Sequence, residues 1–201
     1  MTQNELDLAI KDHEDYLKGV GGKRMILFES NFRNLDFRKA NLEKSVLEDA
    51  DFQGANLEEA NLCGAELNRA NFYKANLRKA NLVGAKLRNA ILCESNLYQA
   101  NASEADMKGA NLEKANLEDA CFRGAYFRLI RSRNVNLEKA DLQKAIFWKA
   151  DLQGSNLRNV KLQETIFWNV NLNDVDFRGA NLSGADFSDS DPNPTQTMLN
   201  S

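Results

Sequence analysis

The chain has 201 residues, of which 43% are hydrophobic and 27% are charged, a composition typical of a chain that folds in water. Its formal net charge of -3 and isoelectric point of about 5.4 argue against the basic surface of a nucleic-acid-binding protein. The three cysteines, Cys63, Cys93 and Cys121, form no CxxC pair. We therefore expect neither a disulfide framework nor a zinc site, but reduced thiols in a cytoplasmic protein.

The first segment, 1–24, is expected to form a helical N-terminal cap. Within residues 4–18, apolar side chains recur at roughly helical spacing: Leu6, Ala9, Ile10 and Leu17. His13 lies in this segment with no other His or Cys nearby, so we expect an ordinary surface histidine rather than a metal ligand. The segment lacks the apolar core of a signal peptide, and no apolar run is long enough to span a membrane.

From Leu27 to Phe187 a large apolar residue recurs every five residues. Of these 33 positions, which we call centres, 31 hold Leu, Phe or Met, and the exceptions are Ala102 and Ser132. The residue two before the centre is Ala at 21 positions, and the residue immediately before it is Asn or Asp at 22 positions. Neither a helix nor a plain strand has this period. Each unit therefore directs one large and one small side chain inward and then turns, as Asn, Asp and Gly favour.

This pattern, for example AlaAsnLeuGluLys at 40–44, resembles that of the pentapeptide repeat proteins. The resemblance covers 25–189 and implies an all-β solenoid, a right-handed quadrilateral β-helix with four units in each coil. About eight coils then form a rod roughly 40 Å long. We assign 190–201 to a flexible C-terminal tail. This leaves the C-terminal edge less covered and available for end-to-end dimerisation, which some relatives use.

Four units per coil place residues twenty apart in stacked columns. One inner column changes from Leu to Phe along the rod, and we expect it to be core packing rather than a ligand site: Leu27, Leu47, Leu67, Leu87, Met107, Phe127, Phe147, Phe167, Phe187. At Ser132 the large side chain is missing, and Ile130 occupies a position for a small residue. We expect a locally deformed turn or bulge here, which is either a tolerated imperfection or a protruding contact.

One outer face is rich in apolar residues: Ile26, Phe28, Val46, Tyr126, Leu129, Ile146, Trp148, Ile166 and Trp168. Trp148 and Trp168 should stack, and Arg128 is placed for a cation–π contact with Trp148. Such a patch usually marks an interaction site. In the alternative interpretation, these residues only brace the turns or cover the terminal helix. The candidate partner-binding residues are Tyr126, Arg128, Ile146, Trp148, Ile166, Trp168, Arg131 and Arg133.

Arg131 and Arg133 belong to a local basic cluster. Arg131 could pair with Asp151 and Arg133 with Glu113, each one coil away, which would lower their value for binding nucleic acid. Elsewhere, acidic and basic pairs alternate between coils, as in Glu58–Glu59 beside Arg78–Lys79. We expect these charges to form a solvated ion ladder without a catalytic role.

The sequence contains no phosphate-binding glycine loop, metal motif or nucleophile–histidine pair, so we expect no enzymatic activity and no cofactor. The favoured function is a non-enzymatic protein-binding or scaffold protein, with self-association as a further option. Its partner would be another protein or a second copy, with no direct contact to nucleic acid or membrane. The alternative, which the quinolone-resistance branch of the resembled family implies, is a DNA mimic that protects DNA gyrase or topoisomerase. However, residues from 25 onward carry 22 Lys and Arg against 24 Asp and Glu, a poor copy of a DNA duplex.

Overall fold

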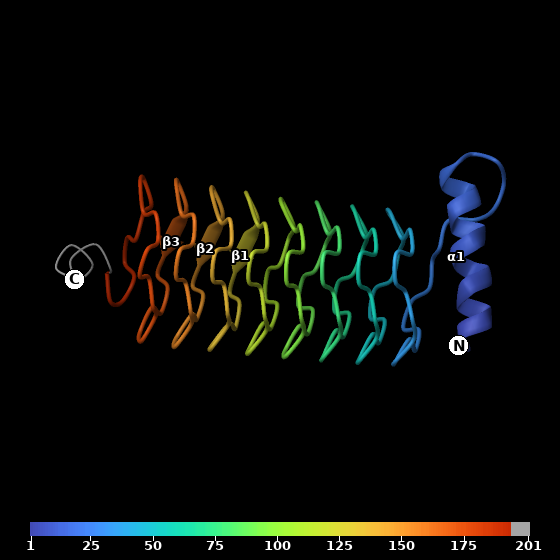
Figure 1. Cartoon of the computed structure of the whole chain (residues 1–201), viewed down its shortest axis with the longest axis horizontal. Coiled ribbons are helices and arrows are strands. Elements are labelled where there is room, and N and C mark those ends of the chain that lie inside the picture. Colours follow the sequence, from blue (N-terminus) through green and yellow to red (C-terminus); the bar gives the residue numbers. More distant parts are fainter. Residues whose placement is uncertain (194–201) are drawn as a thin grey trace.

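The computed structural model describes residues 1–193, which form a long rod with a helix across one end (Figure 1). The regular elements are helix α1 (Gln3–Leu17) and three short strands, β1 (Tyr126–Arg128), β2 (Ile146–Trp148) and β3 (Ile166–Trp168). The rod is a right-handed quadrilateral β-helix of about eight coils, as predicted. Parallel bridges join residues twenty apart, for example Asn41 and Asn61. Most of the predicted tail, 190–201, lies outside the described residues.

Each five-residue unit turns one corner of the coil. The backbone N–H of Ala40 donates to the carbonyl of Phe37 at 3.0 Å, and Lys39 between them has a positive φ of 60°. The Asn side chain before a centre supports the turn, since Asn41 Oδ1 accepts the N–H of Glu43 at 3.2 Å. It also bonds along the rod, accepting Asn61 Nδ2 at 2.9 Å. These two roles explain why Asn is preferred at this position.

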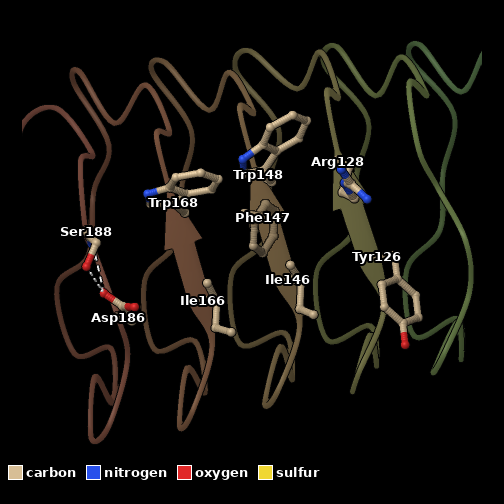
Figure 2. Close-up of a pocket in the computed structure, with 9 residues that line it drawn as sticks. All are labelled: Tyr126, Arg128, Ile146, Phe147, Trp148, Ile166, Trp168, Asp186 and Ser188. Carbon is tan, nitrogen blue, oxygen red and sulfur yellow. Dashed lines mark hydrogen bonds between the residues drawn. The ribbon is translucent and has the colours of Figure 1, made fainter.

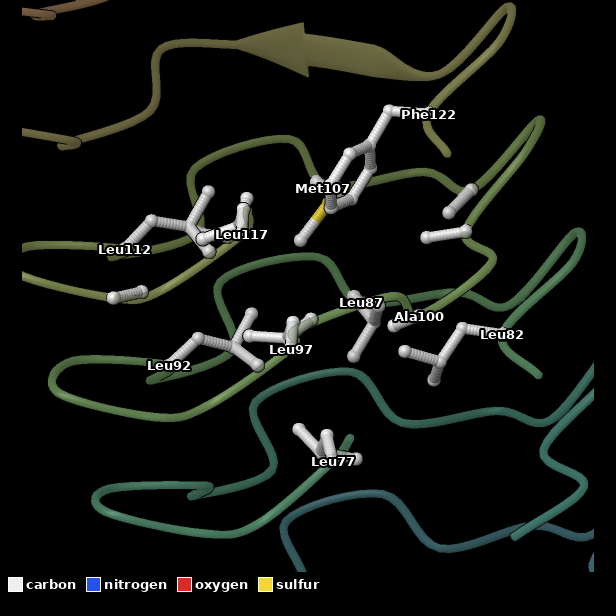
Figure 3. Close-up of a cluster of buried hydrophobic side chains, with 14 of the residues drawn as sticks. Leu77, Leu82, Leu87, Leu92, Leu97, Ala100, Met107, Leu112, Leu117 and Phe122 are labelled. Carbon is white, nitrogen blue, oxygen red and sulfur yellow. The ribbon is translucent and has the colours of Figure 1, made fainter. Parts of the chain in front are cut away.

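The inward side chains form one continuous apolar core (Figure 3). The predicted phenylalanine column is confirmed as core packing. Its rings are stacked with centroids 4.6 Å apart between Phe127 and Phe147, and 4.8 Å apart between Phe147 and Phe167. Ala102 is completely buried, and so is Phe122 one coil later in the same column. The larger ring therefore lies next to the position where the column is thinnest.

Of the two expected deformations around Ser132, the structure shows a modified turn and not a bulge. The bridges from Arg131 to the coils on both sides keep the regular register. Ile130 is buried at a position that Ala usually fills, and Ser132 is buried where Leu or Phe is usual, so large and small residues have exchanged places. The turn is nevertheless modified. The hydroxyl of Ser155 donates to Ser132 O at 2.9 Å and accepts the N–H of Val135 at 3.3 Å, thereby bridging the corner.

Helix α1 covers the N-terminal edge of the β-helix (Figure 1). Leu6 is fully buried against the core, and Ile10 packs beside it. The side-chain amide of Gln3 also pairs with the backbone of the first coil. It donates to Asp36 O at 2.8 Å and accepts the Asp36 N–H at 2.9 Å. The helix thus supplies partners that a further coil would otherwise provide to this ladder edge.

His13 is fully buried, so the expectation of a surface histidine was wrong. Its Nδ1 atom lies 3.0 Å from the backbone nitrogen of Met25, and its Nε2 atom lies 3.0 Å from the carbonyl oxygen of Glu43. Because a backbone N–H can only donate, Nδ1 is the acceptor and Nε2 carries the proton. The imidazole is therefore neutral and joins the helix to the first coil.

Candidate functional site

Strands β1, β2 and β3 stack in register on one side of the rod, with Phe127 aligned with Phe147, and Phe147 with Phe167. The central Phe of each strand points inward, whereas the side chains on either side of it point outward. β-Branched and aromatic residues favour this extended backbone. We call the outward set the aromatic face (Figure 2): Tyr126, Arg128, Ile146, Trp148, Ile166 and Trp168.

The two tryptophans stack, as predicted, with ring centroids 5.9 Å apart and an interplanar angle of 27°. The predicted cation–π contact is also present, since the Arg128 guanidinium lies 4.6 Å from the Trp148 ring. The ammonium of Lys149, which the sequence analysis did not single out, lies 4.7 Å from the same ring. Both cations favour the ring face electrostatically. Trp148 is thus held in one orientation, and Trp168 is 44% exposed beside it.

The indole nitrogen of Trp148 is buried and has no hydrogen-bond partner among residues 1–193. It lies on the side of the ring that faces Trp168 (Figure 2). The indole nitrogen of Trp168, in contrast, donates to Asp189 Oδ2 at 2.8 Å. A hydrogen bond therefore orients the indole of Trp168, whereas the indole of Trp148 is held by ring stacking and by its two neighbouring cations.

An open groove of about 600 Å³ runs along the aromatic face, and it is lined mainly by apolar side chains: Tyr126, Arg128, Ile146, Phe147, Trp148, Ile166, Trp168, Asp186 and Ser188. All six predicted residues of the aromatic face thus come together. Sequence reasoning missed Asp186 and Ser188, because hydrophobicity was used to select the face. The twenty-residue spacing alone could have found them, since they continue its two columns.

The carboxylate of Asp186 lies at the C-terminal end of the groove. Its Oδ1 atom accepts the backbone N–H of Ser188 at 2.9 Å and the Ser188 hydroxyl at 2.5 Å. These hydrogen bonds lower the pKa of Asp186 below its usual value, because they stabilise the ionised form. The groove therefore ends at a permanent negative charge at neutral pH.

Arg131 and Arg133 do not line the groove. Arg133 Nε lies 2.5 Å from Asp151 Oδ2, so the predicted pairing of Arg133 with Glu113 and of Arg131 with Asp151 was wrong. An Arg just after one centre reaches diagonally to an Asp just before a centre in the next coil. Arg33 and Asp51 repeat this geometry at 3.1 Å.

The predicted ion ladder is present at several places. Lys39 lies 3.8 Å from Glu59, and Arg78 lies 3.6 Å from Glu58, each one coil away. The helix, in contrast, does not lie beneath β1–β3, since it covers the opposite end of the rod (Figure 1). This excludes one alternative for the exposed aromatic residues, namely that they cover the terminal helix.

In residues 1–193, no group of three or more His, Cys, Asp or Glu side chains is arranged to hold a metal ion. The same residues include no helix with the length and apolarity needed to cross a membrane. All three cysteines are free and half-buried.

The fold and this surface define the chain as a repeat solenoid whose inner columns build the rod and whose outer columns vary. The chain belongs to the pentapeptide repeat family. The family description, pentapeptide repeats (8 copies), matches residues 26–62, 55–93, 94–128, 133–159 and 155–191. The matches leave out 129–132, the segment in which large and small residues have exchanged places.

Several solved structures are similar to this chain. HetL, a pentapeptide repeat protein involved in heterocyst differentiation regulation from the cyanobacterium Nostoc, is 26% identical; the match covers 88% of this chain and 91% of HetL, with a TM-score of 0.37. QnrB1, a plasmid-mediated fluoroquinolone resistance protein, is 22% identical over 87% of this chain and 85% of its own, with a TM-score of 0.45. A pentapeptide repeat protein from the Arabidopsis thaliana thylakoid lumen is 28% identical over 49% of this chain and 69% of its own, with a TM-score of 0.39. Among curated proteins, none matches this sequence.

Proposed function

We propose that this protein is a non-enzymatic, cytoplasmic binding or scaffold protein that uses the aromatic face to contact a protein partner. The observation that carries the proposal is the ordered tryptophan stack, in which Trp148 is half-buried and Trp168 is exposed. Trp, Tyr and Arg are the residues most enriched in binding hot spots, and here they occupy adjacent coils. Tyr126 and Ile166, which are 46% and 39% exposed, extend the apolar surface around the stack.

Preorganisation supports this use of the face. A partner gains affinity when the residues that it contacts are already held in place, because less side-chain entropy is lost on binding. Trp148 is held by two cations and Trp168 by Asp189. Side chains that only braced turns would not need to form an open apolar groove.

The test is to compare binding by the wild-type protein and by Trp148→Ala/Trp168→Ala. The immobilised proteins would be exposed to extract of the source cells, and retained proteins would be quantified by mass spectrometry. Arg158→Ala, on the opposite side of the rod, is the matched control. We expect a partner that the control retains and the tryptophan variant loses. Identical retention by all three proteins would contradict the role of the aromatic face.

The charge pattern does not favour the DNA-mimic alternative. Acidic side chains on the described surface are repeatedly neutralised by Lys or Arg one coil away, as between Asp49 and Arg69 at 2.6 Å. A mimic of duplex DNA would need uncompensated negative charge along the rod. We therefore propose the binding function alone. A supercoiling assay with purified gyrase and a quinolone checks this directly, and the expected result is no protection.

A further inference from the structure

Charge is distributed asymmetrically around the aromatic face. In the N-terminal half of the aromatic face, the cations Arg128 and Lys149 lie over the Trp148 ring. Asp186 and Asp189 lie just beyond Trp168, at the C-terminal end. One end of the apolar groove is therefore cationic and the other is anionic.

We propose that the partner seated on the aromatic face is a second copy of this chain, docked antiparallel about a two-fold axis that crosses the rod between β2 and β3. The inference rests on the proposed function and names its partner. This axis places β2 against β3 of the second copy, and β1 against its 186–188 segment. The Ile and Trp side chains then meet at the centre, and a cationic end meets an anionic end on both sides.

The register of the coils determines which residues would be opposite each other. Ile166 forms a parallel bridge with Asp186, and the N–H of Asn169 donates to Ser188 O at 3.1 Å, so both columns of the face continue through this coil. In the antiparallel arrangement Tyr126 is opposite Asp186 of the second copy. Arg128 is opposite Ser188, close to the same carboxylate.

A parallel arrangement, with the two-fold axis along the rod, is electrostatically worse. Each coil would then meet its own equivalent. Asp186 and Asp189 would approach the same carboxylates of the second copy, and Arg128 would approach its own equivalent. Because like charges brought together in an interface weaken binding, the charge pattern selects the antiparallel arrangement.

Asp186 is able to accept a bond from outside. Its two hydrogen bonds from Ser188 both end on Oδ1. Among the described residues none donates to Oδ2, so this oxygen is available to Arg128 or to the Tyr126 hydroxyl of a second copy. An Arg–carboxylate contact of this kind gives directionality as well as attraction.

The aromatic face is small, so we expect the dimer to be weak. It extends over four coils, or roughly 15 Å at the ladder spacing. Stable complexes usually bury about 800 Å² on each partner, and this patch offers less. We therefore expect a weak dimer, because the interface lies at the small end of the known range.

The test uses charge reversal at the two ends of the groove, with mass measured by sedimentation equilibrium from about 5 to 500 μM, a range chosen from the interface size. Arg128→Glu and Asp186→Arg should each weaken dimerisation at least about tenfold, because each puts like charges together twice in the symmetric dimer. An equimolar mixture of the two variants should dimerise again, since both contacts are then attractive. Arg158→Glu, on the opposite side, should dimerise like the wild type, and circular dichroism should show that all variants are folded.

Three results would overturn the inference. A wild-type chain that stays monomeric at every concentration would disprove the dimer. A dimer that neither reversal weakens places self-association elsewhere, for example at the C-terminal edge. Single variants that are weakened but not rescued by mixing exclude the antiparallel arrangement. The proposed function is judged separately by the retention experiment, in which any protein, this chain included, that is lost when Trp148 and Trp168 are replaced supports the aromatic face as a binding surface.

Discussion

The imidazole of His13 accepts a hydrogen bond from the backbone N–H of Met25 through Nδ1, at 3.0 Å. On the other side of the ring, Nε2 donates to Glu43 O, also at 3.0 Å. A single buried side chain therefore joins α1 to the first coil at two points, one near each end of that coil. Protonation of Nδ1 would turn the acceptor into a donor facing another donor, and the contact would be lost.

This geometry makes the attachment of the helix sensitive to pH. Burial lowers the pKa of His13 below its ordinary value, because desolvation disfavours the imidazolium. The unfolded chain then takes up the proton first, at a pH of about 6.5. The stabilisation by His13 is complete above that pH, and it decreases as the pH falls toward the lower pKa of the folded state. Thermal unfolding followed by the helical circular dichroism signal between pH 8 and 5 should show this loss.

His13→Gln is the control for that experiment, because glutamine does not titrate. The variant should be less stable at pH 8 by about 1–3 kcal/mol, the usual cost of unsatisfied buried polar groups. Between pH 6.5 and 5 it should lose less stability than the wild type. Equal pH dependence in the two proteins would show that other groups control the acid sensitivity.

Gln3 provides a second prediction at the same end of the rod. Its side-chain amide completes the ladder edge by pairing with both backbone groups of Asp36. Gln3→Ala should expose these groups to water, since the methyl group can neither donate nor accept. We expect exchange of the Asp36 amide hydrogen to accelerate at least about fivefold, as for a hydrogen bond worth roughly 1 kcal/mol. Unchanged exchange of the Asp36 amide would mean that α1 protects this edge without the amide pair. The control is Asn4→Ala, which alters a neighbouring exposed residue.

The third prediction concerns the exchanged sizes of Ile130 and Ser132, which are both buried within one unit. Ser132→Leu alone should overpack the coil and destabilise the protein by about 1–3 kcal/mol. Ile130→Ala alone should leave a cavity and cost a similar amount, about 2–4 kcal/mol. The double variant restores the usual order of small and large residues, so its loss should be smaller than the sum by at least about 1 kcal/mol. Denaturant unfolding of the four proteins measures this coupling. Strictly additive losses of stability would disprove that the sizes of residues 130 and 132 compensate for each other.

The repeat made much of this structure predictable, because its period determines which side chains point inward and which residues stack twenty positions later. The contacts of Trp148 with Trp168 and Arg128 followed from that spacing. The burial of His13 did not, since its partner is an N–H group that becomes available only when α1 docks on the first coil. The pairing of Arg133 also escaped prediction, because a long side chain can reach a diagonal neighbour as easily as the next residue in its column.

Two glycines provide a matched pair for the last prediction. Gly84 and Gly109 both have a positive φ, 62° and 71°, so alanine should strain the backbone similarly at each. Their surroundings differ. A Cβ atom at Gly84 would have no atom within 4 Å, whereas one at Gly109 would overlap with Asn89 Oδ1.

Gly84→Ala should therefore cost about 1 kcal/mol, from backbone strain alone. Gly109→Ala should cost roughly 1 kcal/mol more, because the Asn89 side chain must leave its position. Asn89→Ala removes the obstructing oxygen, so in that background the two glycine substitutions should become equivalent. Chemical denaturation of the single and combined variants measures the difference. If Gly84→Ala and Gly109→Ala lost equal stability in the protein that retains Asn89, the asparagine would move aside freely. Backbone conformation alone would then explain the glycine at position 109.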